Sequence, residues 1–411
     1  MSKRFQAPRG TFDILPAGAE RREAIYLVAA ELFARAGYGR LETPAFEDTE
    51  LFARAVGEGT DIVHKEMFTF TDQGDRSLTL RPEATAAICR AYIEHGMHRL
   101  PQPVKVWSWG PYFRHERPQA GRYRQFHQLD AEVIGSDSPL VDAELIMLLD
   151  DLLRGLGVPG LRLRLSSLGT PASRAAYRKE LLAYLRAREG KLAPEVRERI
   201  SENPLRAFDS KDQATREVMG EAPLMVERLD QPDAEHFAEV RSLLDQAGVP
   251  YVLDGTLVRG LDYYTRTVFE FESEALDAQA ATLGGGGGFY GLVEAIGGPA
   301  TPGCGWAAGI ERILLALDAP EPEPLADVFV AAPGEQGARA FALVQELRGA
   351  GLRAELDLAG RSLKGQMKQA DRLGARRAVI LDDEGKAEVR DMTSGEQEEL
   401  DLARAVEALS R

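Results

Sequence analysis

The sequence predicts an α+β protein with two domains joined by a linker, the first of which carries a helical insertion. Three observations support this prediction. The chain of 411 residues is too long for one ordinary hydrophobic core. Between about residues 170 and 249 it is rich in Arg, Glu and Ala at helical spacing and poor in glycine. The stretch "DAPEPEPLAD" alternates Pro with Glu as linkers do, which predicts domains at residues 1–320 and 328–411 and a linker at 321–327.

The composition is that of a soluble globular protein, with 44% hydrophobic and 28% charged residues. No apolar run approaches the thickness of a bilayer, and the N-terminus lacks the apolar core of a secretory signal. Cys89 and Cys304 are far apart and lack the spacing of metal ligands, which indicates a reducing, cytoplasmic compartment and no structural metal. The net charge of −15 argues against sequence-blind coating of nucleic acid but permits a local basic site.

The first elements are a helix, a short strand and a strand–helix pair. Apolar residues recur at helical spacing from Ile25 to Ala36, and Gly37 ends the predicted helix. "RLETPAFE" follows as a strand that Pro44 interrupts, and a proline there suits a sheet edge or an interface better than a sheet centre. "SLTLRPEATAAICRAYIEH" then predicts a strand that turns into a helix near Glu83.

Two further strands, "PVKVWSWGPYF" and "RQFHQLDAEVIG", are joined by an arginine-rich segment. In the second strand a period of two places Gln128, Asp130 and Glu132 on one face and apolar residues on the other.

The arginine-rich segment is the strongest candidate for a site. Arg114 and Glu116 stand where a strand ends, and Arg122 follows in a loop. The planar donors of arginine match phosphate oxygens, and Phe126 is placed to stack on a purine ring. A solvated hairpin would explain the arginines alone, but the carboxylate face one strand away favours a site for a small polyanion.

Strand character returns after the insertion in "PYVLDGTLVRGLDYYTRTVFEFES", where Arg259, Tyr263 and Tyr264 are candidate ligand contacts. "LGGGGGFYGL" satisfies the G-x-G-x-x-G pattern, but no long helix follows it, so a dinucleotide fold is not indicated. We expect this run to be a tight turn or a place where backbone approaches a ligand.

"GCGWAAGIERILLAL" predicts a strand and a helix with Arg312 in its first turn. An anion site at the helix N-terminus and an ordinary surface position explain this arginine equally well.

After the linker, strands and helices alternate, which predicts a compact α/β domain. The expected strands are "DVFVAA", "RAELDL", "RAVILDD" and "AEVRDM", and the expected helices pass through residues 343–347 and 363–373.

In this order the segments resemble the class II aminoacyl-tRNA synthetases, and most closely the histidyl-tRNA synthetase family. "GYGRLETPAFE", "FRHERPQAGRYRQFHQ" and "GIERILLAL" resemble the three class motifs, and "VRGLDYYT" resembles a signature specific for histidine. "RSLKGQMKQADRLGARRAVIL" resembles part of the anticodon-binding domain. The resemblance covers nearly the whole chain, and it implies a catalytic domain built on a mainly antiparallel sheet followed by an α/β anticodon-binding domain.

The resemblance implies ATP-dependent ligation of L-histidine to its tRNA through a histidyl-adenylate, by a homodimer with Pro44 at the dimer interface. ATP would bring Mg²⁺ with it. The implied catalytic residues are Arg259 and Arg114. Those implied to bind ATP are Arg114, Glu116, Arg122, Phe126 and Arg312. Those implied to bind histidine are Glu83, Thr85, Gln128, Glu132, Tyr263 and Tyr264. Those implied to bind tRNA are Arg361, Lys364, Lys368 and Arg372.

One segment departs from the family. Where the family has Gly-Arg-Tyr-Asp-Gly, this chain has Gly287, Gly288, Phe289, Tyr290 and Gly291, and we expect Phe289 on the wall of the histidine pocket. This change favours an alternative, the histidine-sensing regulatory subunit of ATP phosphoribosyltransferase, which shares the catalytic fold. The retained "VRGLDYYT" and the second domain argue against it, and the arginines argue against a scaffold that only binds tRNA.

Overall fold

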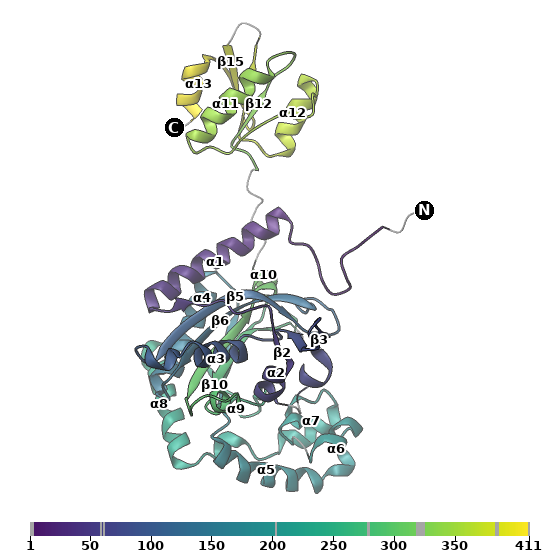
Figure 1. Cartoon of the computed structure of the whole chain (residues 1–411), viewed down its shortest axis with the longest axis vertical. Helices are drawn as coiled ribbons and strands as arrows, with labels where there is room; N and C mark the ends of the chain where they lie inside the picture. The colour runs from purple at the N-terminus through teal and green to yellow at the C-terminus, as the bar shows by residue number, and fades with distance from the viewer. Residues whose placement is uncertain are drawn as a thin grey trace. The chain divides into compact units, whose positions relative to one another are not determined.

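The computed structural model describes residues 4–57, 60, 62–201, 204–277, 280–317, 325–382 and 386–409. Contacts within the chain divide it into two compact units, Met1–Asp318 and Ala319–Arg411, and Figure 1 draws both. Of the expected linker, residues 321–324 lie outside the described residues.

The first unit is built on an eight-stranded sheet in the order β1-β5-β6-β11-β10-β9-β7-β8. Its pairs are antiparallel except at the two edges, where β1 runs parallel to β5 and β7 parallel to β8. The predicted, mainly antiparallel sheet is therefore confirmed. The strands are β1 (Gly39–Arg40), β5 (Val104–Phe113), β6 (Gln125–Ile134), β7 (Leu161–Ser167), β8 (Val252–Leu253), β9 (Thr265–Ser273), β10 (Thr282–Gly288) and β11 (Gly303–Gly309).

Helices and a small second sheet complete the first unit. The small sheet is antiparallel, in the order β2 (Phe46–Asp48), β4 (Ser77–Leu80) and β3 (Phe68–Thr71). The α-helices outside the insertion are α1 (Pro16–Ala36), α2 (Thr49–Val56), α3 (Thr85–Glu94), α4 (Pro139–Gly155), α9 (Leu292–Ala295) and α10 (Ile310–Ala316). Single turns of other helix types lie at Ile62–Glu66 and Met97–Arg99.

The helical insertion has a core of its own. Its helices are α5 (Pro171–Arg186), α6 (Pro194–Arg199), α7 (Gln213–Gly220) and α8 (Gln231–Ala247), with single turns at Glu189–Lys191, Pro204–Asp209 and Met225–Glu227. In α5 the side chains of Tyr177, Leu181 and Leu185 recur every fourth residue and are fully buried. Figure 1 shows α5, α6 and α7 gathered at one end of the first unit.

The two faces of β6 explain where the site lies. Leu129, Ala131 and Val133 pack into the main hydrophobic core, against α1 and α4 residues. Asp130 and Glu132 point to the other face and are each 1% exposed. The period of two read from the sequence therefore holds, and the polar face of the sheet carries buried carboxylates.

The glycine run is a central strand and not the tight turn that we expected. β10 lies between β9 and β11 and pairs antiparallel with both. A Cβ atom on Gly285 would come within 2.3 Å of the Phe269 carbonyl oxygen, and one on Gly286 within 1.8 Å of the Gly305 oxygen. Only glycine fits at these two positions of the strand, because any side chain there would collide with neighbouring backbone.

The second unit is a five-stranded sheet in the order β13-β12-β14-β15-β16. β13, β12 and β14 are parallel, and β15 and β16 continue antiparallel. The predicted α/β domain is confirmed, although the last strand and helix were not foreseen from the sequence. The elements are β12 (Val328–Ala331), α11 (Gly337–Gly349), β13 (Ala354–Leu356), α12 (Leu363–Arg372), β14 (Arg377–Leu381), β15 (Lys386–Asp391), β16 (Gln397–Asp401) and α13 (Leu402–Leu409).

We predict that Gly286→Ala destabilises the first unit by at least about 2 kcal/mol, because the added methyl forces backbone apart in the middle of the sheet. The protein's three tryptophans, Trp107, Trp109 and Trp306, all lie in this unit, so their fluorescence during urea unfolding reports on it alone. Gly190→Ala is the control, since a Cβ there meets nothing within 4 Å. Equal midpoints for the two variants would contradict the steric argument.

Candidate active site

A cavity of about 350 Å³ opens on the polar face of the large sheet. It is lined by residues of β6, β9, β10, β11 and α10, of the loop after β5, and of the segments just before α3 and β9. Eleven of the residues singled out from the sequence meet there although they are up to 229 positions apart, since Glu83 and Arg312 both line it. They are Glu83, Thr85, Arg114, Glu116, Arg122, Phe126, Gln128, Arg259, Tyr263, Tyr264 and Arg312.

One end of the cavity is cationic and holds the arginine-rich segment. The Arg114 guanidinium lies 5.5 Å from the centre of the Phe126 ring, and its Nε donates to the Pro82 carbonyl at 2.9 Å. Arg122 donates to Glu116 Oε2 at 3.3 Å. The solvated hairpin is thus excluded for Arg114 and Arg122, because both line a concave site beside an aromatic ring.

Arg312 extends the same cationic end. Its guanidinium donates to the Gly121 carbonyl at 3.1 Å and to the Thr282 carbonyl at 2.7 Å, which fixes its position. Burial lowers its pKa below the ordinary value, and the nearby charge of Arg122 lowers it further. A bound anion would relieve both effects, so this end of the cavity is arranged to receive negative charge.

Arg259 lies between the two ends of the cavity. It forms an ion pair with Glu270, donates to the Gly285 carbonyl at 3.0 Å, and lies 5.2 Å from the Tyr264 ring centre. Burial lowers its pKa, but Tyr264 and Glu270 outweigh burial, so the net pKa is raised and the guanidinium stays charged. Glu270 was not among the residues predicted from the sequence, although the alternation of "VFEFES" places it on the polar face of β9.

The other end of the cavity is a buried group of carboxylates at the start of α3. Glu83 accepts hydrogen bonds from the backbone N–H groups of Thr85 at 2.8 Å and Ala86 at 2.9 Å. Tyr263 donates to Glu83 at 3.3 Å, and Thr85 donates to Glu132 at 2.6 Å. These contacts make a polar end whose acceptors suit a small cationic or N–H-bearing ligand.

Burial controls the protonation of this end. It raises the pKa of Glu83, against the lowering effect of the two backbone donors. It also raises the pKa of Glu132, and the charges of Asp130 and Glu83 add to that rise. Beneath them, burial raises the pKa of Asp130 from 3.8 to about 8, although Tyr112 donates to it at 2.8 Å. Three carboxyl groups this close disfavour full ionisation together.

Several expected positions need correction or fall outside this cavity. Glu132 does not line it but lies behind Thr85, and Phe289 is buried behind Tyr263, with the two ring centres 6.2 Å apart. The expected place of Phe289 on the pocket wall is therefore wrong. Tyr290 turns away and accepts a hydrogen bond from Arg266 at 3.4 Å.

The remaining predicted residues lie elsewhere in the fold. Pro44 is exposed beside β2 in the first unit. Arg361 precedes α12 and forms an ion pair with Asp357 at 2.5 Å, and Lys364, Lys368 and Arg372 belong to α12 in the second unit.

Comparisons with known proteins find relatives over nearly the whole chain. The family model described as "Histidyl-tRNA synthetase" matches residues 10–313, and the one described as "Anticodon binding domain" matches residues 327–411. The histidine–tRNA ligase of Rubrobacter xylanophilus is 49% identical over 407 residues, with 96% of each chain covered. That of Desulforamulus reducens is 48% identical over 408 residues, with 97% of each covered.

Solved structures give the same result. The apo histidyl-tRNA synthetase of S. aureus superposes with a TM-score of 0.81 at 37% identity, covering 99% of this chain and 100% of that one. A Bacillus halodurans protein described as an ATP phosphoribosyltransferase regulatory subunit/histidyl-tRNA synthetase matches with a TM-score of 0.69 at 22% identity, covering 92% and 99%. The second likeness shows only a shared fold, whereas the relatives at 48% and 49% identity are ligases.

We predict that Asp130→Asn flattens the pH dependence of stability. Because the folded state holds this proton up to about pH 8 and the unfolded chain releases it near 3.8, native stability falls as pH rises through that window. The variant should lose up to about 1.4 kcal/mol per pH unit of that slope, the value for one proton. Urea unfolding followed by tryptophan fluorescence at pH 5 to 9 measures it.

The control for Asp130→Asn is Asp151→Asn, which replaces an exposed carboxylate on α4. Parallel stability curves for wild type and Asp130→Asn would mean that Asp130 is ionised in the folded protein.

Proposed function

We infer the roles of individual residues from one premise: the chain belongs to the histidyl-tRNA synthetase family and ligates histidine to tRNA. The observation that carries the assignment of roles is that a single cavity joins a cationic end to a carboxylate end. ATP fits the first chemically, and the amine and imidazole of histidine fit the second. The reacting α-phosphate and carboxylate would then meet between them, beside Arg259.

At the cationic end the arginines would bind the phosphates of ATP. Arg114 would hold the α-phosphate, and Arg122 and Arg312 the outer phosphates. Phe126 lines the same end of the cavity and would stack on the adenine ring. Glu116 would lie near the adenine, where its ion pairing with Arg122 also orients that arginine.

At the carboxylate end Glu83, Thr85 and Gln128 would bind the amino and carboxylate groups of histidine. Gln128 Oε1 is buried and has no hydrogen-bond partner among the described residues, which supports a role as acceptor for a ligand N–H. Tyr264 would contact the imidazole with Tyr263 beside it. Glu132 would act on histidine through Thr85, because it lies behind that side chain.

The first chemical step is attack of the histidine carboxylate on the α-phosphate of ATP, which forms histidyl-adenylate and expels pyrophosphate. Negative charge builds on the phosphate oxygens in the transition state. Arg259 would stabilise that charge, and its contacts with Glu270 and Gly285 hold it in place before the reaction. A ribose hydroxyl at the end of tRNA would then attack the carbonyl carbon of the adenylate, which forms the histidyl ester and releases AMP.

We propose that Mg²⁺ comes with ATP as part of the substrate. Glu116 and Glu270 line the cavity beside the arginines and supply oxygens of the kind that Mg²⁺ binds. When bound, the ion would neutralise phosphate charge. Among the described residues, no three His, Cys, Asp or Glu side chains form a metal-binding group.

The second unit is the anticodon-binding domain of the family, and we propose that α12 contacts the tRNA there. Lys364, Lys368 and Arg372 repeat every four residues, so they share one face of the helix. Arg361 precedes this helix.

We further propose a homodimer. Phe46 and Phe70 are 48% and 42% exposed on the three-stranded sheet, with ring centres 6.1 Å apart and Pro44 close to Phe46 in sequence. Exposed aromatic rings grouped in this way support an interface.

The two cysteines are buried and free, which supports a cytoplasmic location. Among the described residues, no helix is long and apolar enough to cross a membrane.

We predict that Arg259→Ala lowers pyrophosphate exchange by at least about 1,000-fold and leaves the dissociation constant of histidine within about threefold of wild type, since a contact made in the transition state affects rate more than binding. Exchange assays measure the rate, and calorimetry measures histidine binding. Arg241→Ala, at an arginine on α8 outside the cavity, is the control. Parallel losses in rate and affinity would instead assign Arg259 to histidine binding.

We predict that ending the chain after Glu321 preserves pyrophosphate exchange and lowers tRNA charging by at least about tenfold, the effect of losing contacts worth about 1.4 kcal/mol. The reason is that every residue lining the reaction cavity belongs to the first unit. Full-rate charging by the shortened protein would show that the second unit does not bind tRNA productively.

A further inference from the structure

The loop that carries Arg259, Tyr263 and Tyr264 runs from β8 to β9 through turns, without helix or strand. It supplies residues to the middle of the reaction cavity and to its carboxylate end. A loop has no ladder of backbone hydrogen bonds to fix its shape, so other parts of the fold have to hold its side chains in the geometry that a ligand needs.

The first half of this loop is held by the catalytic sheet. Arg259 forms its ion pair with Glu270 of β9 and donates to the Gly285 carbonyl of β10 at 3.0 Å. Further along, the Asp262 N–H donates to the carbonyl of Val56, the last residue of α2, at 3.3 Å. Arg259 therefore has supports that do not depend on the two tyrosines.

The second half of the loop is held from the helical insertion. Arg174 of α5 donates through its guanidinium to the backbone carbonyl of Tyr264. Burial lowers the pKa of Arg174, and the charge of Asp262 opposes that effect. A guanidinium removed from water in this way makes a stronger hydrogen bond to a carbonyl than an exposed one does.

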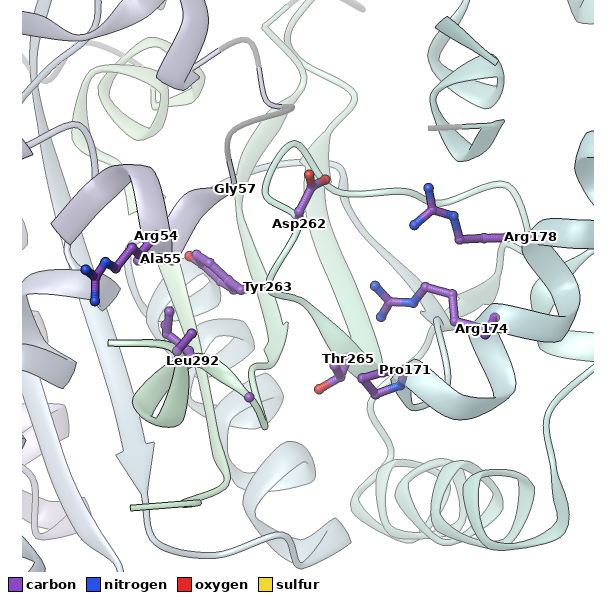
Figure 2. Close-up of a pocket in the computed structure, with 13 residues that line it drawn as sticks. Arg54, Ala55, Gly57, Pro171, Arg174, Arg178, Asp262, Tyr263, Thr265 and Leu292 are labelled. Atoms are coloured by element: carbon purple, nitrogen blue, oxygen red, sulfur yellow. The ribbon is translucent and has the colours of Figure 1, made fainter. Parts of the chain in front are cut away.

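Figure 2 shows the direction of this contact. Arg174 extends from α5 toward the segment between Asp262 and Thr265, while Arg54 of α2 lies on the other side of Tyr263. All five residues line a second cavity, of about 570 Å³, between the insertion and the loop. Arg174 thus reaches the loop from the side opposite α2.

The start of α5 is itself fixed against the sheet. The Leu168 N–H donates to the Arg266 carbonyl at 2.8 Å, and the Arg266 N–H donates to the Gly169 carbonyl at 2.9 Å. Asp233 of α8 accepts from the Thr170 N–H at 2.7 Å. Since Arg174 lies in the first turn of this helix, its guanidinium is positioned from a rigid base.

A shift of the Tyr264 backbone would affect one end of the reaction cavity more than the other. The Tyr264 ring centre is 4.7 Å from that of Tyr263, whose hydroxyl donates to Glu83 at 3.3 Å. At the cationic end, Arg312 is instead held by two backbone carbonyls outside this loop. The contact from α5 is therefore coupled to the carboxylate end and not to the cationic end.

We propose that Arg174 is a positioning residue through which the helical insertion sets the geometry of the histidine site. The inference rests on the function proposed above, in which Tyr263 and Tyr264 contact histidine. Arg174 does not line the reaction cavity, and it acts by holding the Tyr264 backbone before histidine binds. Its loss makes histidine pay for ordering the loop, whereas ATP meets an unchanged site.

The test compares Arg174→Gln with wild type in the absence of tRNA. Calorimetry gives the dissociation constant of histidine, and pyrophosphate exchange gives the KM values of histidine and ATP. We expect the variant to bind histidine about tenfold more weakly, the effect of one charge-assisted hydrogen bond, with the KM of histidine rising in parallel. The KM of ATP should stay within about twofold of wild type.

Two further variants make the test specific. Arg54→Gln is the matched control, because Arg54 lines the same second cavity but forms an ion pair with Glu50 of its own helix. Its histidine dissociation constant should stay within about twofold of wild type. Arg174→Lys keeps a charge and a donor without the planar fork, so we expect it to weaken histidine binding only about threefold. This variant carries the test if Arg174→Gln does not fold, as judged by urea unfolding.

Three outcomes would overturn the inference. An unchanged histidine dissociation constant in folded Arg174→Gln, with or without a lower urea midpoint, would limit the residue to stabilising the insertion. Equal rises in the KM values of histidine and ATP would mean that the substitution disturbs the whole cavity. Equal weakening of histidine binding by Arg54→Gln would assign the effect to charge in the second cavity. Absence of pyrophosphate exchange in the wild type would instead reject the proposed function itself.

Discussion

The site depends on the space that glycine leaves in β10 and β11. A Cβ on Gly285 would lie 3.0 Å from Arg259 Nη1, and one on Gly305 would lie 1.5 Å from Glu132 Oε2. Arg259 and Glu132 therefore occupy volume that side chains would fill in an ordinary sheet. Since those same glycines pack against neighbouring backbone, the sheet and the site are built from one steric constraint.

A second consequence of this packing is the separation of charge along the cavity. The arginines of α10 and of the loop after β5 gather at one end, whereas Glu83 and Glu132 are buried at the other, with Asp130 beneath them. Desolvation acts oppositely on the two groups: it lowers the pKa of Arg312 and raises that of Glu83. Each end is thus arranged to be completed by a ligand group of opposite character, which favours binding both substrates in one orientation.

Much of this fold could be predicted from the sequence where side chains alternate regularly. The faces of β6 followed from apolar spacing, and the strand–helix pair that turns near Glu83 was also predicted. β10 could not be predicted, because glycine has no side chain to alternate and its strand character comes from the flanking strands. β16 could not be predicted from the sequence for a related reason. Its sequence "QEELD" is almost wholly polar, and pairing with β15 decides its structure.

In the candidate site too, some features could be predicted from the sequence and others could not. Arginine-rich loops and tyrosine pairs can be recognised from composition, but the residues that they contact in the fold cannot. Nothing local in the sequence says that Glu270 neutralises Arg259, or that Thr85 stands between Glu132 and the cavity. Such facts depend on which strands become neighbours, and here the sheet places β6 beside β11, a strand that does not follow it in the chain.

The insertion is anchored to the catalytic sheet by Arg266. This residue has φ of +52°, an unusual conformation for a side chain of its size, and donates to Asp233 on α8 at 3.0 Å. Asp233 in turn accepts from the Thr170 N–H at 2.7 Å, so one carboxylate joins both ends of the insertion to β9.

This anchor also accounts for the changed segment after the glycine strand. Asp233 already neutralises Arg266, so a second acid at position 290 is not needed. Tyr290 instead presents its ring 4.9 Å from the Arg266 guanidinium and its hydroxyl as an acceptor. Arg266 follows Tyr264 by two residues, so this anchor of the insertion lies next in the chain to the wall of the reaction cavity.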